Sequence, residues 1–596
     1  MTTVRVRHSV LVHFAVLFGY IGVGVAVTWP HATFLSGRLP ATRDTGSYVW
    51  GFWWMAHAVL NLTSPWHTTY IAAPVGAPLG MHALMPLVGL IMLPVTVLFG
   101  PSASYTFLMV IMPGLLAYAM YRVARLWVPS QIGAIAAGAF FGFSALLDFQ
   151  SWLHLNLTAG IIFLPIALEA AVRFRRRPGL WQAVILGLVL AGSLLTDQES
   201  TILAIVLVVL ALAPWLAPTW KRPAEGEPRR LEIDWRKIGI AAIAGAVAIV
   251  VALPQIVAIV HADAAGSPSA YLNHSAYVQG IKLPDMFLPS PRVNWFGLGG
   301  LWHSANPRTF GFLPVVLGLV GLALAWRRRN ARLLALLWLA TAALSLGADL
   351  ILPGGPVTPV AEFWDGVHVS LVMPYTWFIR IPGLSGFREP SRIAELGLVP
   401  MALLAGYTVN WIRFHARPVL VVVLVLAVFE FGLGTPLKAE HTMPTGLGKL
   451  DGPIAADHSH SIVLDIPFGL RGGTGVTGMP FPTESQVLAT ADQHPLADAL
   501  LSRVPTSTAK AIDNEPFYHD LMLVQTGHHD FTPEQLFAAS QNAVNMHIGW
   551  VLLWIYNKPL RNYLVRTGFH YVYRAEGASV WRPDGFSKTV HGPVAY

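Results

Sequence analysis

HALMPLVGLIMLPVTVLFG, residues 82–100, is the stretch that decides the predicted membrane topology of this chain. It is apolar and long enough to cross a bilayer, but Pro86 and Pro94 interrupt it. If it does not cross, the basic residues between the other apolar runs all fall on one side, which the positive-inside rule identifies as the cytoplasm. If it crosses, Arg5 and Arg7 are separated from all the others. We therefore predict that residues 82–100 form a helix in the outer membrane interface or dipping into it.

The composition around this segment is that of a membrane protein. Of 596 residues, 54% are hydrophobic and only 12% are charged, roughly half the charged share of an ordinary soluble domain. The net charge of +8 would suit nucleic-acid binding only if the basic residues gathered on one soluble face, and they lie between apolar runs instead. Cysteine is absent, which excludes disulfides, thiolate metal sites and cysteine nucleophiles.

The remaining apolar runs predict about 11 membrane crossings, with the N-terminus inside and the C-terminus outside. The predicted spans are roughly 9–28, 103–121, 131–147, 157–174, 179–195, 199–216, 238–260, 310–326, 331–351, 393–412 and 418–434. No small-residue cleavage site follows the first run, so we expect an uncleaved span. Residues 1–434 are thus predicted to form a polytopic α-helical membrane module with outer loops at 29–102, 261–309 and 352–392.

The tail, residues 435–596, has the composition of a soluble domain and is predicted to lie outside the membrane. HSIVLDIPFG alternates like a strand, and FHYVYRAEGASVWRP reads as a hairpin that turns at Glu576–Gly577. MHIGWVLLWIY, residues 546–556, is too short to span a bilayer and is better explained as buried core. We expect a mixed α/β domain.

Polar and ionisable side chains gather at the outer ends of the predicted spans. They are Asp44 after the first span, Asp148, Gln150 and His154 in LLDFQSWLHLNL, and Asp197, Gln198 and Glu199 in LLTDQEST. Charged groups at the ends of apolar spans are costly to desolvate and often line a water-filled cavity. The three acidic turns therefore predict a polar cavity at the outer face.

Four stretches carry a family resemblance: RDTGSYVWGFWWMAHAVLN, SWLHLNLTAGIIFLPIAL, WFIRIPGLSGFREPSRIAELGL and SIVLDIPFG. The first resembles the G-D-P-L-x-x-W-x-x-A-W-x-x-H-A-L stretch of a bacterial family of GT-C membrane glycosyltransferases, and the others resemble further landmarks of that family. The resemblance covers most of the chain, including the tail. It implies a GT-C-like fold and a sugar donor carried on a polyprenyl phosphate. The chain departs from the pattern at Arg43, where the family usually has glycine before the acid.

Such a donor already has a good leaving group, so the enzyme must deprotonate an acceptor hydroxyl and stabilise the departing phosphate. The resemblance makes Asp44 the predicted base; the alternative is that Asp44 caps the helix beginning near Ser47 or pairs with Arg43. Asp148 would be a second acid, which in some GT-C enzymes helps bind a divalent metal such as Mg or Mn. The alternative is a carboxylate hydrogen-bonded in a tight turn, since one carboxylate from each of two loops is a weak metal signal.

Each of the other polar residues in these turns has two possible interpretations. His154 would assist proton transfer or contact a phosphate, or it is a hydrogen-bonded interfacial histidine. Gln150 and Glu199 are candidates for a substrate or metal contact, whereas helix capping by Asp197 explains its turn without a substrate. The three tryptophans within residues 50–54 would stack on sugar faces or anchor the chain at the membrane interface.

The stretch GFREPSRIAE, residues 386–395, supplies the predicted phosphate site. Arg388 and Arg392 straddle a predicted helix start, where free backbone N–H groups and the helix dipole favour an anion. Arg380 lies in the same outer loop. We expect these three arginines to bind the donor phosphate. The alternative is that they snorkel to the interface or pair with Glu389.

Together these patterns predict an inverting glycosyltransferase of a bacterial plasma membrane. It would move a sugar from a polyprenyl-phosphate lipid to an extracytoplasmic acceptor, which is a cell-envelope glycan, a glycolipid or a protein. The tail is expected to bind the acceptor glycan or to shape its access. Two other classes stay open: a lipid or ion-coupled transporter or flippase, which would place ionisable residues near the bilayer midplane, and an inactive glycan-binding scaffold.

Overall fold

The computed structural model describes most of the chain. The residues outside the description are 1, 30–36, 43, 145, 148–153, 222–229, 267–279, 288–309, 353–354, 359–361, 365–366, 382–383, 385–386, 388, 432–441, 447, 473–475, 483, 529 and 585–596. The described chain forms two compact units, each interrupted in sequence. The first comprises residues 1–33, 107–253 and 272–438, and the second comprises residues 34–106, 254–271 and 439–596.

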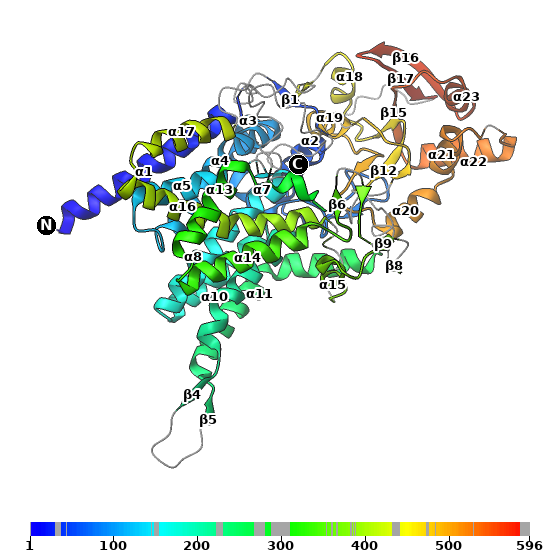
Figure 1. Cartoon of the computed structure of the whole chain (residues 1–596). Helices are drawn as coiled ribbons and strands as arrows, with labels where there is room; N and C mark the ends of the chain where they lie inside the picture. Colours follow the sequence, from blue (N-terminus) through cyan, green and yellow to red (C-terminus); the bar gives the residue numbers. More distant parts are fainter. Residues whose placement is uncertain are drawn as a thin grey trace. The chain divides into compact units, whose positions relative to one another are not determined.

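The first unit is built from apolar helices (Figure 1). They are α1 (Thr2–Val27), α4 (Pro101–Ala124), α5 (Gln131–Gly142), α7 (Leu155–Ile161), α8 (Phe163–Arg176), α9 (Leu180–Leu194), α10 (Gln198–Leu216), α11 (Trp235–Ala264), α13 (Phe312–Ala325), α14 (Arg329–Ser345), α16 (Ile393–His415) and α17 (Val419–Glu430), of which α4 and α11 run beyond its bounds. Short elements join them: the pair β4 (Thr219–Lys221) and β5 (Arg230–Glu232), η3 (Leu283–Met286), β6 (Ile351–Leu352), β7 (Gly355–Pro356), β8 (Glu362–Trp364), β9 (Val367–Val369), α15 (Pro374–Phe378) and η5 (Pro390–Arg392).

Six helical segments of the described chain are long and apolar enough to cross a membrane, which identifies a helical membrane protein. They are Val10–Val27, Pro101–Ala124, Leu155–Arg176, Gln198–Leu216, Trp235–Ala264 and Pro390–His415. Helices α5, α9, α13, α14 and α17 coincide with further predicted spans, but they have only 12 to 17 residues. The count of about 11 crossings therefore stays a prediction.

Residues 82–100, on which the predicted membrane topology depends, contain one helix, α3 (Pro86–Phe99). Pro86 occupies its first turn, where the missing N–H costs nothing, so this proline starts the helix instead of interrupting it. Pro94 lies inside the helix. With 14 residues, α3 is about 21 Å long, which is short of the roughly 30 Å of a hydrocarbon core. Other apolar helices of similar length coincide with predicted spans, so the expectation that α3 does not cross stays a prediction.

Helix α16 is the centre of the first unit and packs against α5, α13 and α14. Small residues allow these close approaches. A Cβ on Gly321 would lie 2.0 Å from the carbonyl oxygen of Leu404, and a Cβ on Gly133 would lie 2.6 Å from that of Gly406. Close backbone packing through glycine is the usual way in which helices associate in lipid.

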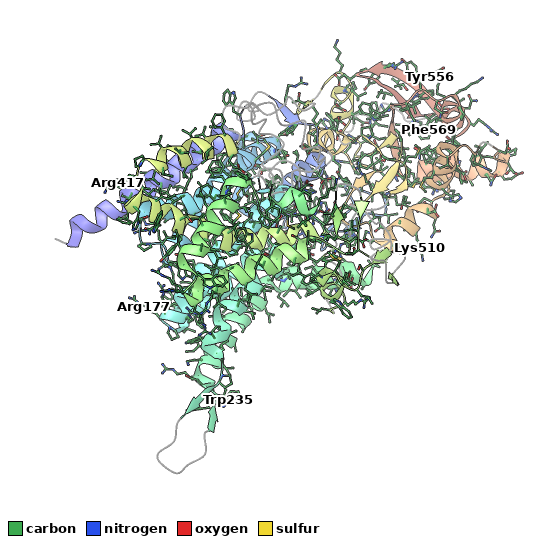
Figure 2. All side chains as sticks on the ribbon, viewed as in Figure 1. Arg177, Trp235, Arg417, Lys510, Tyr556 and Phe569 are labelled. Carbon is green, nitrogen blue, oxygen red and sulfur yellow. The ribbon has the colours of Figure 1, made fainter. Side chains whose placement is uncertain are left out.

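The C-terminal ends of three helices in this unit lie together. Glu169 of α8 accepts hydrogen bonds from Arg122 of α4 and from Arg173, at 2.8 Å in each case. Arg175 donates to the carbonyl oxygen of Ala211, near the end of α10, at 3.1 Å. Figure 2 places Arg177 at the end of the same α8 helix. The C-terminal ends of α4, α8 and α10 thus share one side, as alternating crossings require.

The second unit contains a four-stranded sheet of order β11-β15-β17-β16. Its strands are β11 (Ile462–Ile466), β15 (Ile548–Leu553), β16 (Phe569–Ala575) and β17 (Ala578–Pro583). β11 and β15 are parallel, and the remaining pairs are antiparallel. The predicted hairpin is confirmed: Glu576 and Gly577 have positive φ values of 49° and 94°, as a two-residue hairpin turn requires.

Two strand predictions had different outcomes. Residues 546–556 are core as predicted, because every position of β15 is buried. The stretch around β11 is a strand, but the expected alternation is wrong, since all five of its residues are buried. A parallel neighbour and cover on both faces explain a continuous apolar strand.

The remaining elements of this unit combine the first loop with the tail. They are β1 (Arg38–Pro40), α2 (Thr45–Leu60), β2 (His67–Thr68), β3 (Ala77–Pro78), α3, β10 (Thr442–Pro444), α18 (Gly452–Ala455), β12 (Gly469–Arg471), β13 (Val476–Gly478), α19 (Ser485–Asp492), β14 (Ala499–Leu500), α20 (Thr506–Asp513), α21 (Pro516–Gln525), α22 (Pro533–Asn545) and α23 (Lys558–Arg566). β1 pairs with β10, α2 packs on α19, and the Tyr518 hydroxyl donates to the carbonyl oxygen of Ala73 at 2.9 Å. The first loop and the tail share one hydrophobic core.

Candidate functional site

Asp44, the predicted base, stands at the start of α2 in the second unit. It occupies the N-cap position, yet among the described residues its side chain makes no capping hydrogen bond to the first turn. The capping alternative is therefore wrong for the carboxylate. Other side chains hold the helix start: the Thr42 and Thr45 hydroxyls lie 2.5 Å apart, and the Tyr48 and Tyr105 rings stack with centroids 6.5 Å apart.

His82 fixes the same helix start from the tail side of this unit. Its Nδ1 accepts a hydrogen bond from the backbone N–H of Ser502 at 3.1 Å, which leaves the proton on Nε2, 3.3 Å from the Ser47 hydroxyl. The imidazole is 7% exposed, and burial lowers its pKa to about 4. His82 is thus a neutral link between residue 502 and the first turn of α2. Sequence reasoning missed it because its two partners lie 35 and 420 positions away.

Arg392 is the centre of a polar cluster in the first unit. Its Nη1 lies 2.5 Å from Glu199 Oε2, and its Nη2 lies 3.2 Å from Glu389 Oε1. The three side chains are 9%, 21% and 12% exposed, in that order. The ion pairs join the start of α16 to the start of α10, as convergence of the predicted outer turns requires. An incoming phosphate would compete with two carboxylates for this guanidinium.

The turn before α10 is capped as expected. Asp197 Oδ2 accepts from the Ser200 backbone N–H at 2.7 Å, and Oδ1 accepts from the Asn156 amide at 2.7 Å. The Asn156 contact ties α7 to the turn. A Cβ on Gly160 would lie 2.5 Å from Ser200 Oγ, so glycine is required where α7 meets α10. Two of the predicted outer turns therefore meet in this unit.

Two members of the cluster were missed from sequence. Glu395 is 1% exposed and interacts electrostatically with Arg392, Asp197, Glu199 and Glu389. Among the described residues, the cluster thus sets one guanidinium against four carboxylates. Tyr375, the second missed member, feels the charges of Glu199 and Glu389, and its hydroxyl donates to the carbonyl oxygen of Phe387. The sequence did carry a signal for Glu395, because it follows Arg392 by three residues at the start of an apolar helix.

The other candidates lie in the first unit or outside the described chain. His154 is the N-cap residue of α7, and its backbone oxygen accepts the first helical hydrogen bonds. The Arg380 guanidinium lies over the Trp377 ring, 5.1 Å from its centroid. Asp148, Gln150 and Arg388 lie outside the described residues, as does Arg43. Among the described residues, no group of three His, Asp or Glu side chains could hold a metal ion.

The tryptophans of α2 are neither exposed to a ligand nor placed as interfacial anchors. Trp50, Trp53 and Trp54 are 0%, 8% and 5% exposed, and the Trp50 and Trp54 rings stack 5.7 Å apart. Both expectations for these residues are therefore wrong. They are core of the second unit, packed with residues of the tail.

Comparison with solved structures gives the fold. The arabinofuranosyltransferase AftD from Mycobacteria matches with a TM-score of 0.57 at 14% identity, over 95% of this chain and 40% of AftD. The oligosaccharyltransferase AglB from Archaeoglobus fulgidus, solved with an inhibitory peptide and a dolichol-phosphate, matches with a TM-score of 0.44 at 10% identity, over 97% of this chain and 75% of AglB. The chain thus spans about 40% of the length of AftD. It has a GT-C-like fold. Comparison of the sequence with protein-family models and with curated proteins gives no match.

Proposed function

We propose that this protein is an inverting GT-C glycosyltransferase that moves a sugar from a polyprenyl-phosphate donor to an acceptor outside a bacterial plasma membrane. The observation that carries the proposal is the likeness of the fold to AftD over 95% of the chain. Asp44 and the polar cluster around Arg392 are proposed to carry out the transfer. Asp44 is the base, and the arginines of the 380–392 loop meet the donor phosphate.

The proposed step is a single displacement. Asp44 takes the proton of the acceptor hydroxyl as its oxygen attacks the anomeric carbon, and the bond from that carbon to the phosphate oxygen breaks. One displacement inverts the anomeric configuration. The Asp44 carboxylate stands at the start of α2 and does not cap that helix.

On the donor side, Arg380, Arg388 and Arg392 are proposed to stabilise the departing phosphate. Arg392 already has two carboxylate partners, so the phosphate takes the place of one of them. Glu199 is the more exposed partner, at 21%, so we expect the phosphate to displace Glu199 from Arg392. Replacing Glu199 with glutamine should then tighten donor binding, because the phosphate no longer competes with a charge.

A transfer assay on purified full-length protein tests the proposal. Wild type, Asp44→Asn and a control, Asp513→Asn, are given a panel of radiolabelled polyprenyl-phosphate sugars; Asp513 is an exposed carboxylate of the tail. We expect Asp44→Asn to lose turnover by about 10²- to 10⁴-fold with donor binding retained, as removal of a general base predicts. Asp513→Asn should match wild type.

Two results would contradict the proposal. Full turnover in Asp44→Asn would remove this residue from the base role. No consumption of any donor by wild type would favour a transporter or a scaffold, and movement of labelled lipid across vesicles would then separate those two classes.

A further inference from the structure

Arginines of the first unit form a row where α4 and α8 end side by side. Glu169 Oε1 accepts hydrogen bonds from Arg122 Nη2 and from Arg173 Nε, at 2.8 Å in each case. One turn further along α8, Arg176 Nη2 donates to the carbonyl oxygen of Leu126 at 3.4 Å. The spacing of residues 169, 173 and 176 is that of one helix face. Two successive levels of α8 are thus joined to the end of α4.

The arginine row, which we define as Arg122, Arg125, Arg173 and Arg176, carries an excess of positive charge. All four side chains are exposed. Glu169 is the one acidic residue of the sequence between Asp148 and Asp197, and residues 101–147 contain none. Four guanidinium groups therefore share one carboxylate, which leaves a net charge of +3.

The start of α11 comes close to the end of α8 and brings further acids with it. Lys237 lies over the Trp215 ring, 5.7 Å from its centroid, and that ring meets the Phe174 ring edge-on at 5.4 Å. Asp234 is 3.4 Å from Lys237 and is thereby paired. The whole connector 219–237 contains six basic and four acidic residues, so it does not cancel the charge of the row.

The row lies at the depth of a bilayer's headgroups. Pro101–Ala124 and Leu155–Arg176 are both long and apolar enough to cross a membrane, and the row begins in the last turn of each. Arginines at the ends of spans extend their guanidinium groups into the headgroup layer. Leu180 and Trp181 follow at the start of α9 and are 65% and 72% exposed. Tryptophan favours the same layer.

The guanidinium groups are held in place without being neutralised. Arg122 and Arg173 share a single carboxylate oxygen, and Arg176 spends one N–H on a carbonyl oxygen, so each keeps further donors. The Arg125 side chain makes no hydrogen bond or ion pair within the described chain. Guanidinium forks with spare N–H groups suit phosphate oxygens, and side chains already held in position lower the entropic cost of binding.

We propose that the arginine row binds an anionic phospholipid of the membrane, with the phosphodiester on the guanidinium groups and the acyl chains in the surrounding bilayer. The positive-inside rule explains why basic residues gather on one side, but not why one carboxylate joins them across two helices. An acidic protein fits less well, because Arg122 and Arg173 belong to the apolar segments themselves. Basic sites between membrane helices are suited to anionic headgroups. The proposal needs no part of the transfer reaction.

Native mass spectrometry of the purified full-length protein tests the site without any sugar donor. The protein, in a neutral detergent and about 0.15 M ammonium acetate, is titrated with phosphatidylglycerol and with phosphatidylcholine of the same acyl chains. We expect the first phosphatidylglycerol to bind at least about tenfold more tightly than phosphatidylcholine, because each arginine near an anionic headgroup contributes roughly fivefold in affinity.

Two arginines of the row can be replaced without unpairing Glu169. Arg125→Gln/Arg176→Gln should weaken phosphatidylglycerol binding by at least about tenfold. Arg125→Gln alone removes no hydrogen bond of the described chain, so it keeps the test decisive if the double variant does not fold. It should weaken binding about fivefold. Thermal unfolding checks that each variant is folded.

A matched control makes the same change in charge at other helix ends. Arg417 resembles Arg176, because it also donates to one carbonyl oxygen, that of Arg413, at 3.4 Å. Figure 2 places Arg417 apart from Arg177, which follows α8. Arg329→Gln/Arg417→Gln should therefore leave phosphatidylglycerol binding within about twofold of wild type.

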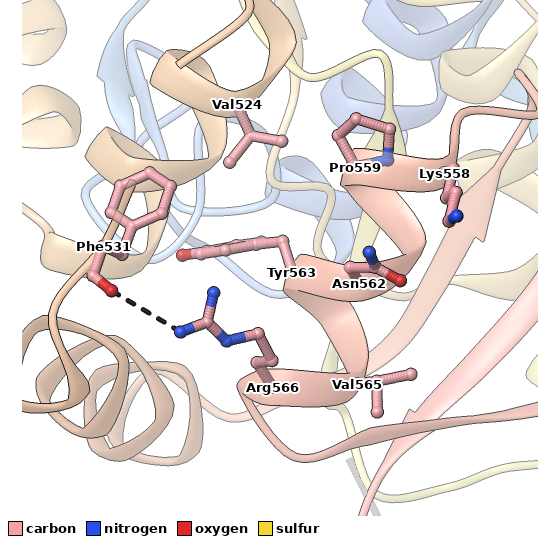
Figure 3. A pocket seen from close by; sticks show the side chains of 8 residues that line it. All are labelled: Val524, Phe531, Lys558, Pro559, Asn562, Tyr563, Val565 and Arg566. Atoms are coloured by element: carbon pink, nitrogen blue, oxygen red, sulfur yellow. Dashed lines mark hydrogen bonds between the residues drawn. The ribbon is translucent and has the colours of Figure 1, made fainter. Parts of the chain in front are cut away.

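A second control lies in the tail. Figure 3 shows the Arg566 guanidinium meeting the carbonyl oxygen of Phe531, at 3.5 Å, in a surface groove that Lys558 also lines. Exposed Asp530 and Glu534 flank Phe531 in the sequence, so two acids match these two cations. Lys558→Gln/Arg566→Gln should bind phosphatidylglycerol like wild type.

Three results would overturn the proposal. The first is equal affinity of the wild type for both lipids. The second is equal weakening by the row variant and the Arg329→Gln/Arg417→Gln control, which would leave only the general attraction of a basic surface. The third is displacement of the lipid by an equal concentration of inorganic phosphate or of poly-glutamate, which would identify a site for a soluble anion or an acidic protein.

Discussion

Neutralising Asp492 should make the second unit more stable at alkaline pH, although most substitutions of buried residues destabilise. Asp492 is 9% exposed, and its Oδ1 accepts a hydrogen bond from the His494 backbone N–H at 2.9 Å. Burial, together with the charges of Asp451 and Asp465, raises its pKa to about 8. Asparagine retains the acceptor and the shape, so Asp492→Asn removes only the titrating proton.

The magnitude follows from proton linkage. A carboxyl with an ordinary pKa of 3.8 and a folded pKa of about 8 is protonated in the folded protein and ionised in the unfolded chain between these values. Folding therefore takes up a proton, and the stabilisation present below pH 3.8 is lost as pH rises through 8. From pH 5 to pH 8 the loss amounts to about 3 to 4 kcal/mol, or roughly 6 to 16 °C in Tm for a unit of this size.

Thermal unfolding of full-length wild type and Asp492→Asn, from pH 5 to pH 8, measures this effect. The difference between the two proteins is the useful quantity because His82 titrates in the opposite sense. Its pKa is lowered from 6.5 to about 4, so its contribution is lost as pH falls, equally in both proteins. We expect the Tm of Asp492→Asn to rise steadily relative to the Tm of wild type as pH increases. A difference that stays constant would refute the reasoning.

Three further predictions concern packing and polar contacts, each measured by thermal unfolding of the full chain. Arg392→Met leaves the Glu199 carboxylate without its cation and should destabilise the first unit by about 3 to 5 kcal/mol; a loss below 1 would contradict a desolvated ion pair. Gly160→Ala forces α7 away from α10 and should cost about 1 to 3 kcal/mol, whereas a neutral result would contradict the close approach. His82→Leu leaves the Ser502 N–H unpaired at a cost of about 1 to 3 kcal/mol, and His82→Asn, which restores an acceptor, should cost less.

Local sequence patterns were enough to predict individual helices and strands. Apolar runs located the long helices, the Glu576–Gly577 pair located the hairpin, and the length of the 546–556 run excluded a span. In each case the signal lies within a few residues, where periodicity and turn chemistry act. The same holds for Asp197, whose cap depends on a neighbour three positions away.

Partners far apart in sequence could not be predicted. Arg392 and Glu199 are 193 positions apart, and neither turn alone indicates which charge the other supplies. The tryptophans of α2 were misread for the same reason: an aromatic cluster after an apolar run looks interfacial until the strands of the tail cover it. Burial of such residues depends on tertiary structure, which a single sequence does not display.

The shared core of the first loop and the tail has a consequence for biosynthesis. Tyr518 and Ala73, which are joined by a hydrogen bond, are 445 positions apart, so at about 5 to 20 residues per second the ribosome supplies the second roughly 20 to 90 seconds after the first. Throughout that interval α2 lacks the strands that cover its tryptophans. Nascent chains halted before residue 460 should therefore recruit holding chaperones, and a tail produced by itself should aggregate unless residues 34–106 are supplied in trans.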